Sequence, residues 1–284
     1  MADPISPPPG FTAALVFDDP TPNAIILNRV NRRAVEIAGS CTDLNREECN
    51  DFLDLVMLIS RKMVSVWKHL QAYHLEEKRL REQFADPAAK HHVYSQELFE
   101  EFDVFAVQIK STLDHVVKVM RPMLGRKWTM YTFAGKGEGV LASLKNNTPR
   151  KHAGRVKSME HFLFSERHRA WLAAIIDSRD RMNHCQEGGL RIEKFAVFRE
   201  PVGTIHVPMW SDEQELGKAM DAIWSNFFHF VEDFIMLALH FRVLDEKFSM
   251  FRKEEPLSST TSSWAVMTKA DGDALIKKLG ATPA

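Results

Sequence analysis

Apolar residues recur at intervals of three and four along four long segments of this chain, a spacing that places them on one face of an α-helix. The first segment, 45–84, contains no proline or glycine. The second, 96–120, follows Ser95, a residue type that caps helices. The third and fourth are 157–184 and 211–243. We therefore expect an all-α fold in which about four long helices form an up-down bundle.

Weaker patterns lie between these segments. A short helix is predicted over 139–146. A small β-hairpin is predicted just before the last long helix, because 194–199 and 204–207 alternate between apolar and polar residues on either side of a Pro- and Gly-containing turn. A capping box over 211–214 predicts the start of the fourth helix.

The two ends of the chain differ in composition from the middle. Residues 1–40 begin with a proline-rich stretch and show little periodicity, which predicts an irregular leader. Residues 251–284 contain the Ser/Thr run 258–263, and only 271–279 has a helical pattern, so we expect a flexible tail with one short helix. The bundle should then occupy residues 41–250.

Charge and cysteine content narrow the classes of function. The chain has 37 Lys and Arg against 38 Asp and Glu, a formal net charge of -1, so any contact with RNA must be local. Three cysteines form no C-x-x-C pair, which favours a reducing compartment and predicts a cytoplasmic protein. No secretion signal and no apolar run long enough for a bilayer span is evident, so no membrane association is expected.

The six residues Arg179-Asp-Arg-Met-Asn-His184 lie at the end of the third predicted helix. Arg179 is a fixed cation and His184 titrates near neutral pH, a pair that suits phosphate chemistry. On a straight α-helix these two side chains would lie about 140° apart around the axis. Either the helix unwinds near Asn183, or a second copy of the chain supplies one of the two groups.

This arrangement resembles the R-x(4-6)-H motif of HEPN domains, all-helical modules found in RNA-cleaving toxins, in defence proteins and in non-catalytic nucleotide-binding relatives. Asp180 stands where these domains have a polar residue. Lys110-Ser-Thr-Leu-Asp114 is similar to a K-x-x-L-D segment on an early helix of many bacterial HEPN-like proteins, and a Phe- and Gly-containing connection, 133–137, follows it as it does there. The resemblance covers about residues 95–245.

The resemblance implies a protein that binds RNA or a nucleotide, with metal-independent endoribonuclease activity and no cofactor. His184 would take a proton from a ribose 2′-OH or deliver one to the leaving oxygen, while Arg179 neutralises charge on the phosphate. Asp180 and Asn183 would orient the histidine or the substrate. The candidate substrate-binding residues are Lys110, Asp114 and Arg181. The products would carry 2′,3′-cyclic phosphate and 5′-OH ends.

The resemblance also implies partners. HEPN ribonucleases have the motif at a two-fold interface, so a homodimer is expected. A place in toxin–antitoxin or antiviral systems would follow, with a protein partner such as an antitoxin.

The same residues also have structural interpretations. Arg179 could pair with Asp177 or Asp180, while the histidine caps the helix end. Lys110 and Asp114, four positions apart, could form a surface ion pair. The alternative function is a non-catalytic helical scaffold or regulatory module that binds a protein or nucleotide through the same dimer surface.

Two other kinds of site find no support in the sequence. The twelve histidines and three cysteines form no recognisable metal-ligand spacing, so no metal site is predicted. The glycines of 135–139 lack the spacing of a phosphate-binding loop. We expect a turn there.

Overall fold

The computed structural model describes residues 18–86, 92–183, 192–201 and 203–279. Helices dominate these residues, and the strands form only small sheets, so the predicted all-α fold is confirmed.

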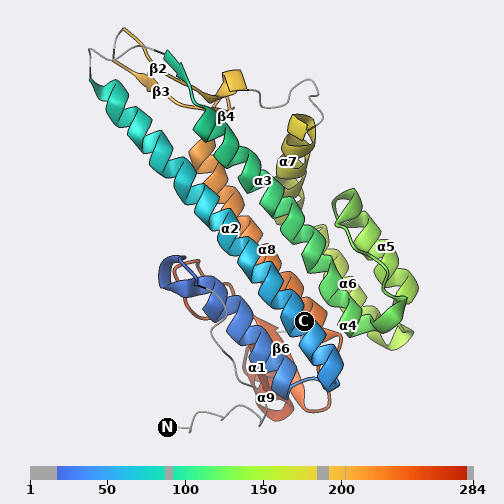
Figure 1. Ribbon diagram of the computed structural model, residues 1–284. Helices are drawn as coiled ribbons and strands as arrows, with labels where there is room; N and C mark the ends of the chain where they lie inside the picture. The colour runs from blue at the N-terminus through green and yellow to red at the C-terminus, as the bar shows by residue number, and fades with distance from the viewer. Residues whose placement is uncertain (1–17, 87–91, 184–191, 202, 280–284) are drawn as a thin grey trace.

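Three long helices, α2 (Arg46–Ala85), α3 (Gln96–Val116) and α8 (Leu216–His240), lie side by side along the length of the molecule (Figure 1). A fourth, α7 (Glu166–Asn183), packs against both α3 and α8. The other α-helices are shorter: α1 (Arg33–Ser40), α4 (Met120–Leu124), α5 (Glu138–Asn147), α6 (Ala153–Leu163) and α9 (Lys269–Leu279). Short helical segments of other types precede or connect them: η1 (Pro22–Ala24), the π-helix η2 (Ile26–Arg32), η3 (Val117–Val119), η4 (Gly125–Lys127), η5 (Ala134–Gly137), η6 (Arg150–His152) and η7 (Ile192–Phe195).

The helix α2 is one uninterrupted helix of 40 residues, in agreement with its pattern. The Asn45 side chain accepts a hydrogen bond from the backbone N–H of Glu48 (2.9 Å), and the Glu48 carboxylate accepts one from the backbone N–H of Asn45 (3.1 Å). This capping box satisfies donors that the first helical turn would otherwise leave free. Phe52, Ile59 and Val66, seven residues apart, are fully buried along the face toward the other helices.

In the described ranges, the strands form three small antiparallel sheets. The predicted hairpin is present as β2 (Ala196–Arg199) and β3 (Ile205–His206), with Phe198 opposite His206. An additional strand, β1 (His92–Tyr94), pairs with the other edge of β2. The remaining pairs are β4 (Met209–Ser211) with β5 (Gln214–Glu215), and β6 (Phe248–Arg252) with β7 (Trp264–Thr268).

Two helix boundaries differ from the predictions. The third segment is two helices, α6 and α7, because the chain turns at Phe164 and Ser165, which lets both helices pack against α8. The predicted capping box at Ser211 is also wrong. Ser211 pairs with Gln214 in the β4–β5 sheet, and α8 begins only at Leu216.

The N-terminal region from Ile26 onward is helical, which corrects the prediction of an irregular leader over 1–40. Residues 1–17 of that leader lie outside the described residues. η2 and α1 contact α2 and α8, and they bury apolar side chains against them. Polar residues interrupt the apolar spacing of this segment, and two of them, Arg29 and Asn31, are buried because they find partners in Glu232 and Ser60.

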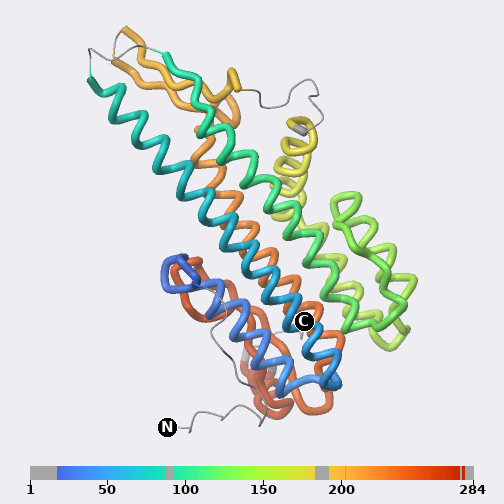
Figure 2. Tube along the Cα trace, viewed as in Figure 1, coloured from blue at the N-terminus to red at the C-terminus, as the bar shows by residue number. Residues whose placement is uncertain are grey.

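The C-terminal region is also built into the fold, which corrects the prediction of a flexible tail. The Ser/Thr run leads into β7, and its last residue, Ser263, is buried and accepts a hydrogen bond from the Arg29 guanidinium (2.9 Å). Hydrogen bonds therefore hold this segment where apolar content is lacking. The predicted short helix is confirmed as α9. Figure 2 shows the N-terminal helical segment and the C-terminal segment together at one end of the bundle.

The helix α8 forms the centre of the bundle. Of the helices in the described ranges, only α8 is long and apolar enough to cross a membrane, and 83% of its apolar window is buried inside the protein. A buried core helix passes the same test, so α8 is weak evidence for a membrane span.

Candidate functional site

The Arg179 motif lies at the C-terminal end of α7, which ends at Asn183. His184 and Cys185 lie outside the described residues, so the structure does not test whether Arg179 and His184 come together. Arg179 Nη1 donates a hydrogen bond to Asp180 Oδ1 at 2.7 Å. This ion pair is one of the two structural alternatives that the sequence left open for Arg179.

The pair with Asp180 uses only part of the Arg179 guanidinium. The side chain is 30% exposed, and its Nε atom is buried without a hydrogen-bond partner among the described residues. A buried donor without an acceptor typically costs about 1–3 kcal/mol. Arg179 Nη2 is not buried and has no hydrogen-bond partner among the described residues, so it is the donor that a ligand acceptor such as a phosphate oxygen can reach.

Asp103, on α3, faces Arg179 across the contact between α3 and α7. Burial raises the pKa of the Asp103 carboxyl, and the nearby Arg179 guanidinium opposes this only in part. No hydrogen bond from another described residue reaches this carboxyl. A half-buried carboxyl with a raised pKa beside a cation is the kind of group that takes part in proton transfer.

Asp103 was not singled out by the sequence patterns, although a signal for it exists. Asp103, Lys110 and Asp114 are separated by seven and four residues on one helix. These separations place all three within about 40° around the helix axis. A search for polar residues on a shared face of α3 would therefore have included Asp103.

Lys110 and Asp114 form an ion pair within α3, with Lys110 Nζ 2.5 Å from Asp114 Oδ1. The same carboxylate oxygen accepts a hydrogen bond from the backbone N–H of Phe133 (2.7 Å). The pair is mostly buried and fixes the start of the glycine-rich turn. Both residues were predicted as substrate-binding groups, and this geometry gives them at least a positioning role.

The glycine-rich turn, η5, connects to α7 through an exposed ion pair between Lys136 and Asp177 (2.9 Å). Gly135, Lys136 and Gly137 all have positive φ angles, of 56°, 52° and 104°. This left-handed conformation is costly for Lys136 because it carries a Cβ atom. The turn is thus held between α3 on one side and α7 on the other.

Together these groups form a polar surface that we call the α3–α7 seam. It consists of Asp103, Lys110, Asp114, Lys136, Asp177, Arg179 and Asp180. Arg181, the third predicted substrate-binding residue, is exposed beside it and forms no ion pair with a described residue. The side-chain position of Asn183 is outside the described part of the structure. Within the described ranges, no three His, Cys, Asp or Glu side chains converge to hold a metal ion.

Comparisons of the chain with protein-family models, with curated proteins and with solved structures find no significant match. The resemblance to HEPN domains therefore depends on the motif residues and on the helical context alone.

Proposed function

We propose that this protein binds RNA or a nucleotide at the Arg179 end of the α3–α7 seam, and that it is a HEPN-like endoribonuclease that needs no metal ion. The observation that carries the proposal is the state of Arg179. Its guanidinium is anchored by Asp180 through Nη1, keeps an accessible Nη2 without an acceptor among the described residues, and stands beside the Asp103 carboxyl five residues before His184. An arginine held in this way is available to a phosphate oxygen.

The chemistry divides among these residues. A ribose 2′-OH attacks the adjacent phosphorus, and His184 accepts its proton. The bond from phosphorus to the 5′-oxygen breaks, and a proton is delivered to that oxygen, which leaves 2′,3′-cyclic phosphate and 5′-OH ends. Arg179 neutralises the charge that builds on the phosphate, and Asp180 holds its guanidinium. Asp103, with its raised pKa, is a second candidate for proton transfer.

A homodimer would complete the site. Arg179 and a residue five positions later point about 140° apart on a regular helix, so a two-fold pairing of α7 ends could bring the arginine of one copy to the histidine of the other. Cys41 and Cys49 are both free and buried, in keeping with the reducing cytoplasm that we propose as the compartment.

A second candidate function is a non-catalytic scaffold or regulatory module. The ion pairs Arg179–Asp180 and Lys110–Asp114 favour it, because each satisfies part of the seam without a ligand. In this case the same surface would bind a protein or a nucleotide, and no RNA would be cut.

The deciding experiment is incubation of a mixed RNA pool with the purified full-length protein in EDTA, followed by analysis of the cleaved ends. We expect 2′,3′-cyclic phosphate ends with the wild-type protein, and a loss of at least about 100-fold in rate for Arg179→Ala and for His184→Ala. Asp103→Asn should lower the rate and shift its pH profile.

Arg169→Ala is the matched control, because Arg169 is an exposed arginine at the other end of the same helix. It should cut RNA as the wild type does. If the wild-type protein leaves all RNA intact, the nuclease assignment is wrong, and retention of labelled RNA or nucleotide then separates binding from the scaffold function. Light scattering on the same samples reports the expected dimer.

A further inference from the structure

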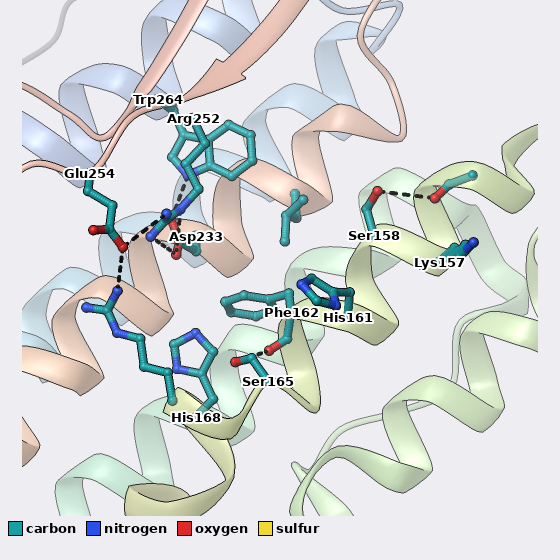
Figure 3. A pocket seen from close by; sticks show the side chains of 13 residues that line it. Lys157, Ser158, His161, Phe162, Ser165, His168, Asp233, Arg252, Glu254 and Trp264 are labelled. Carbon is teal, nitrogen blue, oxygen red and sulfur yellow. Dashed lines mark hydrogen bonds and ion pairs between the residues drawn. The ribbon is translucent and has the colours of Figure 1, made fainter. Parts of the chain in front are cut away.

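A separate cavity of about 520 Å³ lies between α6, the first turn of α7, α8 and the β6–β7 sheet (Figure 3). Its apolar wall includes Phe162, Leu237 and Trp264, each less than one-tenth exposed. The Phe162 ring is fixed by stacking on Phe230, with ring centroids 4.9 Å apart. A preformed, largely apolar cavity of this size suits a small flat organic molecule.

His168 places a hydrogen-bond donor in this cavity. Its side chain is buried, and burial lowers its pKa to about 4, so the imidazole is neutral at pH 7. Trp171 Nε1–H donates to His168 Nδ1 at 3.4 Å, which assigns the ring proton to Nε2. This N–H meets no acceptor among the residues that the structure describes. A ligand oxygen could accept it.

The two carboxylates that line the cavity are already paired with arginines. Asp233 Oδ1 accepts hydrogen bonds from Arg252 Nε (3.0 Å) and from Trp264 Nε1 (2.8 Å). Glu254 lies 3.3 Å from Arg167 and 3.8 Å from Arg252. The lining therefore offers donors to a ligand and few free acceptors.

The charge of the lining is positive. Lys157 and His161, one turn apart on α6, form no ion pair or hydrogen bond with any described residue. The lining contains three cations, Lys157, Arg167 and Arg252, against the two carboxylates, a formal charge of +1 with the histidines neutral. Figure 3 shows Lys157 and His161 on one side of Phe162 and His168 on the other. The free cation and the free donor thus lie at opposite ends of an apolar wall.

We propose that this cavity binds a small aromatic carboxylate that carries a second acceptor oxygen. The aromatic body lies along Phe162, the carboxylate lies at the mouth near Lys157 and His161, and the second oxygen accepts the Nε2–H of His168. The site is distinct from the α3–α7 seam, and its test uses no RNA.

The probe is 6-methoxy-2-naphthoate, a rigid carboxylate with an ether oxygen at its far end, measured by calorimetry with the full-length protein. Two analogues each remove one feature: 2-naphthoate lacks the ether, and the corresponding 6-methoxy alcohol lacks the charge. We expect saturable binding of the probe in the micromolar range, and binding weaker by about tenfold for each analogue.

Three variants locate the probe. Lys157→Gln should weaken binding of both carboxylates about tenfold and leave the alcohol unchanged. His168→Phe should weaken the methoxy carboxylate toward the affinity of 2-naphthoate. Ser158→Trp, which places an indole at the mouth without altering the core, should abolish binding of all three compounds. Lys68→Gln is the matched control, because Lys68 is an exposed lysine on α2 that does not line the cavity, and it should bind as the wild type does.

Each outcome decides the proposal. If the wild type shows no saturable binding up to roughly 1 mM, or if Ser158→Trp binds as well as the wild type, the site is wrong. If the alcohol binds as tightly as the carboxylate, the cavity is not selective for anions and the proposed ligand class is wrong. Because Lys157 and Ser158 are not in the core, their variants should fold, which circular dichroism and a melting curve confirm.

Discussion

Two arginines of this protein are bound in opposite ways. Arg29 is fully buried and uses four of its five guanidinium N–H groups: it donates to both carboxylate oxygens of Glu232 (3.2 and 2.6 Å), to the carbonyl of Pro256 and to the Ser263 hydroxyl. Arg179, at the α3–α7 seam, is partly exposed and donates one hydrogen bond to its sequence neighbour Asp180. The first arginine is closed to a ligand by its burial, whereas the second is open to one.

The difference separates a structural polar network from a candidate binding surface. The Glu232 carboxylate has further partners, since its Oε1 also accepts hydrogen bonds from the Ser262 hydroxyl and from the Ser263 backbone N–H. Every polar atom there depends on its neighbours, so removal of one leaves the others buried and unpaired. At the partly exposed Arg179 end of the seam, water or a ligand can replace a lost partner.

The largest effect is expected at the buried pair. Glu232→Ala should lower the free energy of unfolding by about 3–5 kcal/mol, because it leaves the Arg29 charge buried without its carboxylate. Urea denaturation measures this. The double variant Arg29→Met with Glu232→Leu removes both charges and should be clearly more stable than Glu232→Ala. If the two variants are equally unstable, packing rather than charge controls this region.

The next effect is a pH dependence from His168. Its pKa falls from 6.5 in the unfolded chain to about 4 in the folded protein, so the unfolded state binds more protons between these values. Stability should therefore fall as the pH drops, by about 2 kcal/mol from this group between pH 7 and pH 5. Urea denaturation at both pH values should show the loss in the wild type and a smaller one in His168→Phe.

His74 provides the control for this pH dependence. Its hydrogen bond to Asp221 raises its pKa, so His74 stabilises the fold as the pH falls and loses that contribution as the pH rises. His74→Gln should thus leave the loss between pH 7 and pH 5 as large as in the wild type, or larger. A smaller loss in His74→Gln would mean that the acid sensitivity had been wrongly assigned to His168.

A smaller effect is expected within the seam at Asp114. Asp114→Ala leaves both Lys110 and the buried backbone N–H of Phe133 without an acceptor, and should cost about 1–3 kcal/mol. Lys110→Ala removes only the ion pair and should cost less than about 1 kcal/mol. Equal losses for the two variants would mean that the hydrogen bond to the turn contributes little.

The smallest effect is expected at Arg179. Arg179→Ala should change the free energy of unfolding by less than about 1 kcal/mol, because the ion pair is partly exposed and the variant also removes the buried Nε that has no partner among the described residues. Thermal melting beside Glu232→Ala measures the contrast. A loss at Arg179 as large as that at Glu232 would make the seam a structural network and would support the scaffold function.

Local patterns predicted the elements whose stability is local. The apolar period of α2 and the Ser95 cap of α3 can be read from neighbouring residues, and so can the β2–β3 hairpin and α9. Elements that depend on distant partners were missed. The segment around Arg29 contains too many polar residues to predict a buried helix, and its partner Glu232 is 203 residues away.

The same reasoning applies to the candidate site. Asp114 and Arg179 could be selected by their motifs, yet the hydrogen bond of Asp114 to Phe133 depends on the course of the turn between them. Asp103 becomes a candidate site residue only because α7 packs against α3 and brings Arg179 close to the Asp103 carboxyl. The approach of Arg179 to His184 stays a prediction, because His184 lies outside the described residues.

The Arg29 network also predicts an order of folding steps during translation. Arg29 leaves the ribosome long before Glu232, Pro256 and Ser263, and its guanidinium has no complete set of acceptors until all three have emerged. The N-terminal helical segment should therefore dock late, after translation of the β6–β7 sheet. Chains that terminate early within the Ser/Thr run would retain an exposed N-terminal segment, which a chaperone or a protease could recognise.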